Sequence, residues 1–187
     1  MNEKEKMLAG ELYDANYNEC LMKERIIAKD KCFEYNNLKP SNLENRIALM
    51  KEILGSTKEN FLIEQPFICD YGYNIEIGKN FYSNHNLIIL DGNKVEFGDN
   101  VFIGPNCGFY TAGHPLDVES RNKGLEYARP IKVGNNVWFG GNVVVLPGVK
   151  IGNNVVIGAG SVVNKDIPSN TVAVGNPCKV KKQFNKY

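Results

Sequence analysis

The chain has 187 residues, 43% of them hydrophobic, and a formal net charge of +1. This length and apolar content fit one hydrophobic core, and the near-neutral charge argues against nucleic acid or a membrane as a general partner. No apolar run is long enough to span a membrane, and the N-terminal MNEKEKMLAG has no apolar signal-peptide core. The five cysteines are odd in number and form no CxxC pair, so we expect a reduced, cytoplasmic protein.

Residues 1–60 are predicted to form a helical segment. Its best-marked helix begins at Ser41, has Glu44 three positions later as a capping box, and ends at Gly55. The apolar face of this helix would consist of Leu43, Ile47, Met50 and Leu54. We expect the segment to cover the open end of the fold that follows it.

Residues 61–177 follow a period of six. The hexads with the clearest spacing begin at Val133, Phe139, Val145, Ile151, Ile157 and Val163. Neither a helix nor an alternating strand explains this period, so we interpret each hexad as a short strand with a tight turn and three hexads as one triangular coil. The sequence therefore predicts a mainly β solenoid with ladders that pair Val133 with Ile151, Phe139 with Ile157, and Val145 with Val163.

The same period is interrupted in the earlier coils and disappears after Phe109. Its leading residues there are predicted to be Tyr71, Ile77, Ser83 and Ile89 and, after a two-residue slip, Phe97, Ile103 and Phe109. Residues 110–130 are too polar and too long for a turn, so we expect a loop thrown out from one corner of the coil. Residues 178–187 contain Lys179, Lys181, Lys182 and Lys186, and we expect a short basic tail that is either solvated or binds phosphate.

Two histidines, His85 and His114, are the natural candidates for a base that works near neutral pH. His114 lies where the period breaks and the long loop departs, whereas His85 lies within a strand-like hexad. A structural or surface role is the alternative for each of them. A zinc site needs more nitrogen or sulfur ligands than one chain offers here, so we expect no metal unless subunits pool their ligands.

Carboxylates and amides gather in the coils before the long loop and within it. They are Asp70, Asn74, Asn84, Asn86, Asp91 and Glu126. Asn and Asp at solenoid corners usually form turns. The alternative is a polyol site, because such groups match pairs of hydroxyls, and Asn84 and Asp91 are expected to face one groove with His114.

Taken together, these motifs resemble the sugar O-acetyltransferases of the hexapeptide-repeat family, which include the maltose, galactoside and nodulation acetyltransferases. The resemblance runs nearly end to end and is carried by Lys6–Tyr13, Asp70–Ile75, Gly78–Asn84, Gly113–Pro115, Pro130–Trp138 and Gly158–Pro168. It implies a left-handed parallel β-helix and a homotrimer with its active sites between neighbouring solenoids. It further implies transfer of an acetyl group from acetyl-CoA to a sugar hydroxyl.

The resemblance also implies roles for individual residues. His114 would be the general base, and the Asn84 amide would stabilise the tetrahedral oxyanion. Acceptor contacts would fall on Asp70, Tyr82, Asp91, Glu126 and the Asp14 region, although the stretch around Asp14 is one residue longer than in relatives. Gly92 and Asp70 replace an acidic residue and a serine of some galactoside enzymes, which favours a maltose-like acceptor.

Coenzyme A is implied along the outer corners of the solenoid. The matching positions are Trp138, Gly140, Gly141, Ala159, Asn164 and Lys165, with Lys179 and Lys182 near the ribose phosphate. Trp138 is equally consistent with an outward aromatic residue at a subunit seam. Three other functions stay open: transfer to an amine or xenobiotic acceptor, a non-catalytic binding or assembly module, and a zinc-dependent hydrolyase.

Overall fold

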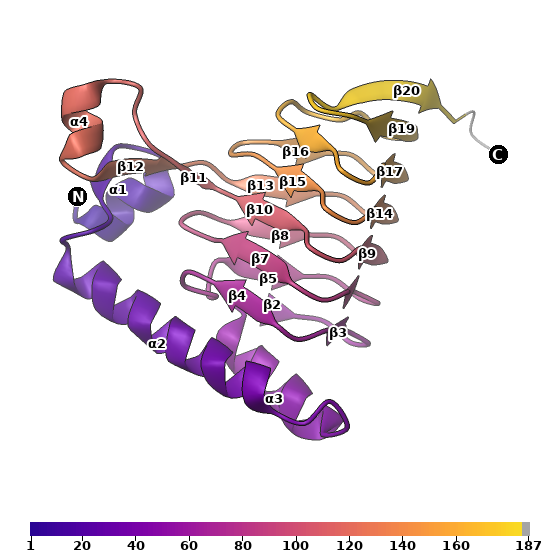
Figure 1. Cartoon of the computed structure of the whole chain (residues 1–187), viewed down its shortest axis with the longest axis horizontal. Coiled ribbons are helices and arrows are strands. Elements are labelled where there is room, and N and C mark those ends of the chain that lie inside the picture. The colour runs from indigo at the N-terminus through magenta and orange to yellow at the C-terminus, as the bar shows by residue number, and fades with distance from the viewer. Residues whose placement is uncertain (185–187) are drawn as a thin grey trace.

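The computed structural model describes residues 1–184 and shows a left-handed parallel β-helix with helices packed at its N-terminal end (Figure 1). Each coil contributes one short strand to each of three flat faces. The first face consists of β2 (Ser56–Thr57), β5 (Ile75–Ile77), β8 (Val95–Phe97), β13 (Ile131–Val133) and β16 (Lys150–Ile151). The second face consists of β3 (Leu62–Ile63), β6 (Tyr82–Ser83), β9 (Val101–Ile103), β14 (Val137–Phe139), β17 (Val155–Ile157), β19 (Thr171–Val174) and β20 (Lys179–Gln183). The third face consists of β4 (Phe67–Cys69), β7 (Leu87–Leu90), β10 (Gly108–Tyr110), β15 (Val144–Val145) and β18 (Val162–Val163).

The predicted ladders are confirmed. Val133 pairs with Ile151, Phe139 with Ile157, and Val145 with Val163, all in parallel register. These side chains are buried inside the prism. Further along the axis, the rings of Phe81, Phe97, Phe109 and Phe139 pack edge to face with centroids 5.0 to 5.2 Å apart, an arrangement that adds to the hydrophobic gain of burial.

The prediction that Tyr71 leads a hexad is wrong. Cys69 occupies that ladder position and pairs with Ile89, which in turn pairs with Phe109. Tyr71 is instead buried in a separate cluster with Met7 and Tyr13. The two-residue slip predicted after Ile89 therefore also occurs one coil earlier, and both slips lie at the corner between the third and first faces.

We call this corner the loop corner, because residues 111–130 also leave the coil there. The segment carries β11 (Ala112–Gly113), α4 (Val118–Asn122) and β12 (Leu125–Ala128). An N-terminal strand, β1 (Tyr13–Asp14), pairs antiparallel with β12, so a small sheet in the order β1-β12-β11 stands beside the solenoid (Figure 1). The departures from the regular period are thus concentrated at one corner.

The corner between the first and second faces carries a ladder of asparagine side chains. Its members all have positive φ, and each amide donates to the next side-chain oxygen at 2.9 to 3.3 Å: Asn60, Asn80, Asn100, Asn136, Asn154 and Asn170. Asparagine tolerates this left-handed backbone better than most residues. The ladder holds in register coils whose spacing changes from 20 to 36, 18 and 16 residues along the chain.

Two helices close the N-terminal end of the solenoid, as expected. Helix α2 (Glu19–Asn37) buries Ala28, Cys32 and Tyr35, and the Cys32 Sγ lies 3.6 Å from the Cys69 Sγ of β4. Helix α3 (Leu43–Ile53) packs beside it, and a third helix, α1 (Glu3–Ala9), lies near the loop corner (Figure 1). No helix within residues 1–184 is long and apolar enough to cross a membrane.

The predicted start of α3 is wrong by one residue. Its N-cap is Asn42, whose side chain accepts from the Asn45 amide, and not Ser41. Asparagine caps a helix as well as serine does, so the Ser-x-x-Glu spacing did not decide the boundary. The buried face of α3 also differs from the predicted one. It consists of Arg46, Leu49, Met50 and Ile53, whereas Leu43 is half exposed.

The basic C-terminal segment was expected to be a tail, but its described part forms strand β20. This strand pairs antiparallel with β19 and extends the second face. Lys179 and Lys182 stay exposed on it. Lys186 lies outside the described residues.

Candidate active site

The strand pair β11–β12 sets the position of His114. Gly113 pairs with Tyr127, and a Cβ added at Gly113 would come within 2.6 Å of the Tyr127 Oη. Any larger residue at this position would have to displace the Tyr127 phenol. The His114 ring follows directly and lies with its Nδ1 3.1 Å from the Leu125 carbonyl oxygen.

The contact with Leu125 defines the chemistry of the His114 ring. A carbonyl oxygen only accepts hydrogen bonds, so Nδ1 carries the proton and Nε2 presents its lone pair when the ring is neutral. Nε2 lies 3.9 Å from the Glu126 Oε1, and about half of the His114 side chain (49%) is exposed. The ring is therefore oriented on one nitrogen and accessible on the other.

Glu126 is in turn held by the N-terminal segment. Tyr13 pairs with Glu126 across β1 and β12, and its hydroxyl donates to the Glu126 Oε2 at 3.2 Å. Tyr13 is almost fully buried, and burial raises the pKa of its phenol well above the usual range. The phenol is therefore a permanent donor to this carboxylate at physiological pH.

Asp91 and Asp70 lie side by side at the loop corner in different environments. Asp91 is fully buried, and its carboxylate accepts from the backbone amides of Asp70, Tyr71 and Asn74 at 3.1, 2.9 and 3.3 Å. Burial, with the charge of Asp70 adding to it, raises the pKa of Asp91 to about 7. These contacts make Asp91 the centre of the turn that presents Asp70.

Asp70 has no side-chain hydrogen-bond partner among residues 1–184. Burial raises the pKa of its carboxyl group, and the nearby Arg25 guanidinium opposes this rise. Arg25 also donates to the Tyr71 hydroxyl at 2.8 Å. Asp70 therefore faces the loop corner as a partly buried carboxylate with free acceptor capacity.

Asp14 is engaged in a local turn. Its Oδ1 accepts from the backbone amides of Asn16 and Tyr17 at 3.2 and 2.9 Å. Such bonds are typical of aspartate in an Asx turn. The side chain nevertheless belongs to the same strand pair as Glu126, because Asp14 pairs with Leu125.

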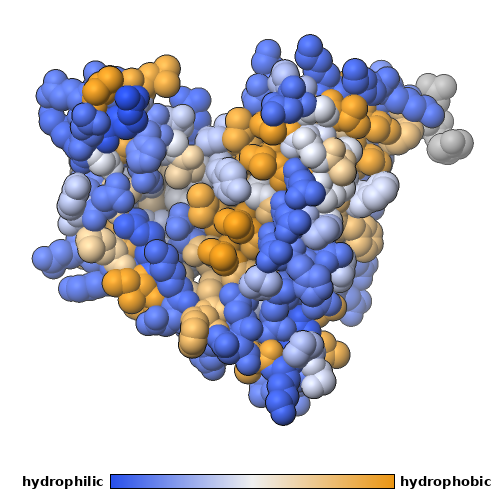
Figure 2. All heavy atoms as spheres, viewed as in Figure 1, coloured by the Kyte–Doolittle hydropathy of each residue, from blue (hydrophilic) through white to orange (hydrophobic). Residues whose placement is uncertain are grey.

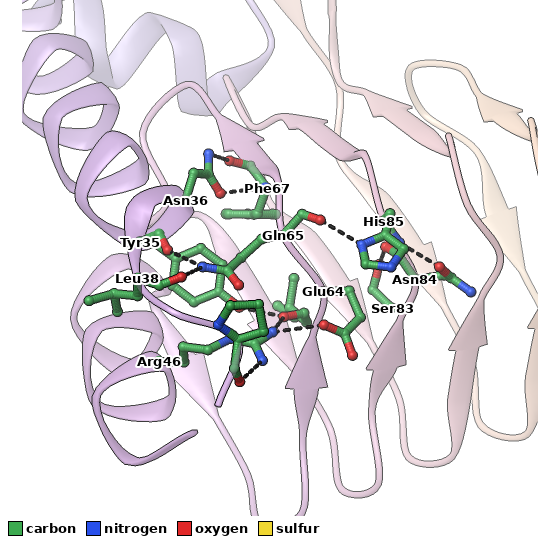
Figure 3. A network of polar contacts seen from close by, with 12 residues as sticks. Tyr35, Asn36, Leu38, Arg46, Glu64, Gln65, Phe67, Ser83, Asn84 and His85 are labelled. Atoms are coloured by element: carbon green, nitrogen blue, oxygen red, sulfur yellow. Dashed lines mark hydrogen bonds and ion pairs between the residues drawn. The ribbon is translucent and has the colours of Figure 1, made fainter. Parts of the chain in front are cut away.

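Asn84 lies at a different corner, between the second and third faces, which we call the Asn84 corner. The Asn84 Oδ1 accepts from the His85 amide at 2.8 Å, and the His85 Nδ1 lies 2.6 Å from the Gln65 carbonyl oxygen (Figure 3). Asn84 and Asp91 thus lie beyond opposite ends of β7. The expectation that both face one groove of a single chain is wrong.

The Asn84 corner continues through three of the predicted coenzyme A positions: Gly140, Gly141 and Ala159. The coils stack there through hydrogen bonds such as that from the Gly160 amide to the Gly141 carbonyl oxygen, 2.9 Å long. A Cβ at Gly140 would come within 2.6 Å of the Ala159 backbone nitrogen. At Gly140 the neighbouring coils therefore lie backbone to backbone, with no room for a side chain between them.

The other predicted cofactor positions lie elsewhere. Trp138 points outward from β14, is 56% exposed, and aligns with Phe102 and Tyr82 across the second face. Asn164 and Lys165 follow β18 at the loop corner, and Lys179 and Lys182 lie on β20. A single chain therefore does not bring the predicted cofactor residues together.

Tyr13, Tyr71 and Arg25 were not identified from the sequence. The Tyr13 hydroxyl donates to Glu126, the Tyr71 backbone amide donates to Asp91, and Arg25 donates to the Tyr71 hydroxyl. Tyr13 and Tyr71 lie in segments that carry the family resemblance, and this was the only available signal for them. Among residues 1–184, no cluster of three or more His, Cys, Asp or Glu side chains is arranged to hold a metal ion.

Comparison with known proteins agrees with this architecture. Residues 6–58 match the maltose acetyltransferase hexapeptide capping motif, and residues 130–165 match the bacterial transferase hexapeptide model of six repeats. A Saccharomyces cerevisiae protein named as an acetyltransferase by inference is 58% identical over 94% of this chain and 90% of its own length.

Solved structures give the same result along the whole chain. A maltose O-acetyltransferase from Clostridium difficile 630 superposes with a TM-score of 0.97 at 52% identity, covering 100% of this chain and 99% of that one. A galactoside acetyltransferase in complex with coenzyme A superposes with a TM-score of 0.95 at 46% identity, covering 99% and 92%.

The stacked coils, the capping helices and the loop beside them define an acyltransferase of the left-handed β-helix class. More narrowly, the chain belongs to the maltose and galactoside acetyltransferase family of hexapeptide-repeat proteins.

Proposed function

We propose that this chain is an acetyl-CoA-dependent O-acetyltransferase that acts on a hydroxyl of a sugar or glycoside. The observation that carries the proposal is the orientation of His114, whose Nδ1 is occupied by the Leu125 carbonyl and whose Nε2 is accessible. The relatives named as maltose and galactoside acetyltransferases support the acyl donor and the acceptor class.

In the proposed reaction, Nε2 of His114 removes the proton of an acceptor hydroxyl as its oxygen attacks the thioester carbonyl. The tetrahedral intermediate then collapses, the carbon–sulfur bond breaks, and the imidazolium returns the proton to the leaving thiolate of coenzyme A. The amide of Asn84 donates to the oxyanion and so lowers the activation barrier by about 3 to 4 kcal/mol.

Asn84 and His114 lie at different corners of one chain, so we propose that the active site forms between copies in a homotrimer. The loop corner of one copy would then meet the Asn84 corner of its neighbour. This arrangement also unites the cofactor positions: Gly140, Gly141 and Ala159 come from one copy, and Asn164 and Lys165 from the other.

The character of the three faces supports such an assembly. The outward row of the first face is charged and internally paired, with Lys94 2.6 Å from Glu76 and Lys132 3.4 Å from Glu96. The outward rows of the other faces are apolar and include Phe102, Trp138, Ile68 and Ile88. Figure 2 shows apolar side chains over the part of the third face where β4, β7 and β10 lie in Figure 1. Exposed apolar rows of this kind are typical of subunit interfaces.

For the acceptor, we assign direct contacts to Asp70 and Glu126, whose carboxylates match pairs of sugar hydroxyls. Tyr82 would contribute from the second face. Asp91 has no exposed surface, so we assign it to shaping the turn of Asp70 rather than to contact with the acceptor. Asp14 is assigned the same kind of role, because its carboxylate caps a turn.

For coenzyme A, the Asn84 corner supplies a backbone edge along which a pantetheine arm can lie. Trp138 borders this edge on the second face. Lys165, Lys179 and Lys182 would meet the phosphate groups, because lysine binds phosphate as a point charge.

The test compares His114→Ala with His85→Ala, the matched variant of the other histidine. Coenzyme A thiol release is measured with acetyl-CoA and a panel of sugars, amino sugars and small amines, and trimer formation is checked by light scattering. We expect His114→Ala to assemble normally and to lose about 10² to 10⁴ in turnover, as for a missing general base, whereas His85→Ala retains most activity.

Other outcomes of this test separate the alternatives. Near-normal transfer by His114→Ala would refute the mechanism, and activity on amines alone would move the acceptor to the amine or xenobiotic class. The absence of coenzyme A binding in calorimetry at millimolar ligand would favour a non-catalytic assembly module.

A further inference from the structure

The Tyr13 hydroxyl occupies the space beside Gly92 at the loop corner. A Cβ added at Gly92 would lie 3.1 Å from the Tyr13 Oη and 3.2 Å from the Ala128 Cβ. Gly92 therefore leaves room for this phenol, which enters the corner from β1 and donates to Glu126. The contact joins residues 113 positions apart in the chain, so it depends on the docking of the N-terminal segment.

The two oxygens of Glu126 face different partners. Oε2 accepts from Tyr13 at 3.2 Å, whereas Oε1 lies 3.9 Å from the Nε2 of His114, too far for a hydrogen bond. The carboxylate is thus within ion-pair range of the ring but is not hydrogen bonded to it. The gap leaves Nε2 free to accept a proton from an acceptor hydroxyl.

We propose that Tyr13 is a positioning residue for acetyl transfer, which holds the Glu126 carboxylate back from His114 and so keeps His114 available as a base. The inference rests on the proposed function, in which Nε2 of His114 is the base. Tyr13 acts through Glu126, and Gly92 is the position that permits it.

Several ionisable groups lie near the Glu126 carboxylate. They are Tyr13, Asp70 and Tyr71, together with Arg25 of α2, which acts on Asp70 and Tyr71. Of these, only Tyr13 hydrogen bonds to Glu126 among the described residues. Removing the Tyr13 hydroxyl is therefore expected to change the position of the Glu126 carboxylate before that of any other group.

Tyr13→Phe removes the hydroxyl and keeps the buried ring. The released carboxylate can then approach Nε2, and an opposite charge at closer range favours the protonated imidazole. We expect the proton affinity of His114 to rise about three- to tenfold, which is a pKa increase of about 0.5 to 1. Because the base works in its neutral form, the acidic limb of kcat/KM moves to higher pH by the same amount.

The pKa is measured by NMR on protein labelled with ¹³C-histidine, in the assembled full chain, between pH 5 and 9. The chain has only two histidines, so the His85→Gln variant assigns both signals. This readout does not depend on acetyl transfer. An inactive protein that shows the predicted shift would refute the proposed function and leave the role of Tyr13 toward His114 standing.

A double-variant cycle makes the test specific. In the Glu126→Gln background the hydroxyl has no charge to restrain, so adding Tyr13→Phe is expected to leave the His114 pKa unchanged. Gly92→Ala, which crowds the phenol without altering it, is expected to shift the pKa in the same direction as Tyr13→Phe. An unchanged pKa in Tyr13→Phe, or a shift on Tyr13→Phe that persists in the Glu126→Gln background, would overturn the inference.

Discussion

The asparagine ladder allows a prediction in which backbone geometry and hydrogen bonding are measured separately. Asn136 has φ 57° and lies in the middle of the ladder, where it accepts from Asn100 at 3.0 Å and donates to Asn154 at 3.0 Å. Asn142 has nearly the same φ, 58°, but its side chain has no hydrogen-bond partner among residues 1–184. The two positions form a matched pair.

Glycine at either position adopts the left-handed backbone at low cost. It raises the conformational entropy of the unfolded chain, however, which lowers the free energy of unfolding by about 0.5 to 1 kcal/mol. At Asn136 the same change also removes two hydrogen bonds, each worth about 0.5 to 1.5 kcal/mol. We therefore expect Asn136→Gly to cost about 1 to 3 kcal/mol more than Asn142→Gly. Alanine adds a left-handed backbone cost of about 1 to 2 kcal/mol at both positions.

The assay is denaturant unfolding at one fixed protein concentration, because any association of chains changes the apparent stability by mass action. The difference between positions 136 and 142 is expected to be the same for the glycine pair and for the alanine pair. If Asn136→Gly and Asn142→Gly unfold at the same denaturant concentration, the hydrogen bonds of the ladder do not contribute to stability. The asparagines would then serve only to accommodate the left-handed backbone.

Three further outcomes follow from the loop corner and β20. Gly113→Ala places a Cβ 2.6 Å from the Tyr127 Oη and is expected to lower kcat/KM at least tenfold, about the effect of a small displacement of the base; adding Tyr127→Ala should restore part of it. The folded-state pKa of Asp91 is raised to about 7, so the folded state binds more protons than the unfolded one between about pH 4 and 7. The Tm should therefore fall as pH rises through this window, and a Tm that rises instead would contradict the burial argument. Lys179→Ala with Lys182→Ala is expected to raise KM for acetyl-CoA in a salt-dependent way and leave KM for the acceptor unchanged.

The solenoid was predictable because its pattern is local. Val133 and Ile151 pair through a spacing that each coil repeats, so the ladder can be read without knowledge of distant contacts. The pattern failed at Tyr71, where an apolar residue stands near a ladder position but packs on the N-terminal segment. It also failed at Ser41, because two adjacent residues compete as N-cap and single-residue preferences do not separate them.

The arrangement of the candidate site was not predictable from the sequence, and the choice of its residues stays a prediction. His114 and Glu126 were identified from the sequence, but the contact of Nδ1 with the Leu125 carbonyl depends on how β11 and β12 pair. The burial of Asp91 follows from a turn that wraps three backbone amides around it. Neither feature has a sequence signature, because a turn-forming aspartate and a ligand aspartate look the same.

The β-helix, the capping helices and the corner from which the long loop departs could all be predicted from the sequence, because each depends on short-range periodicity. By contrast, the packing of the folded chain places Asn84 and His114 at different corners and brings Tyr13 to Glu126 across 113 positions. Contacts of that range depend on the docking of β1 against the loop, which is a packing result rather than a repeat. The pattern of six therefore defines the scaffold, and the docked N-terminal segment defines the geometry around the base.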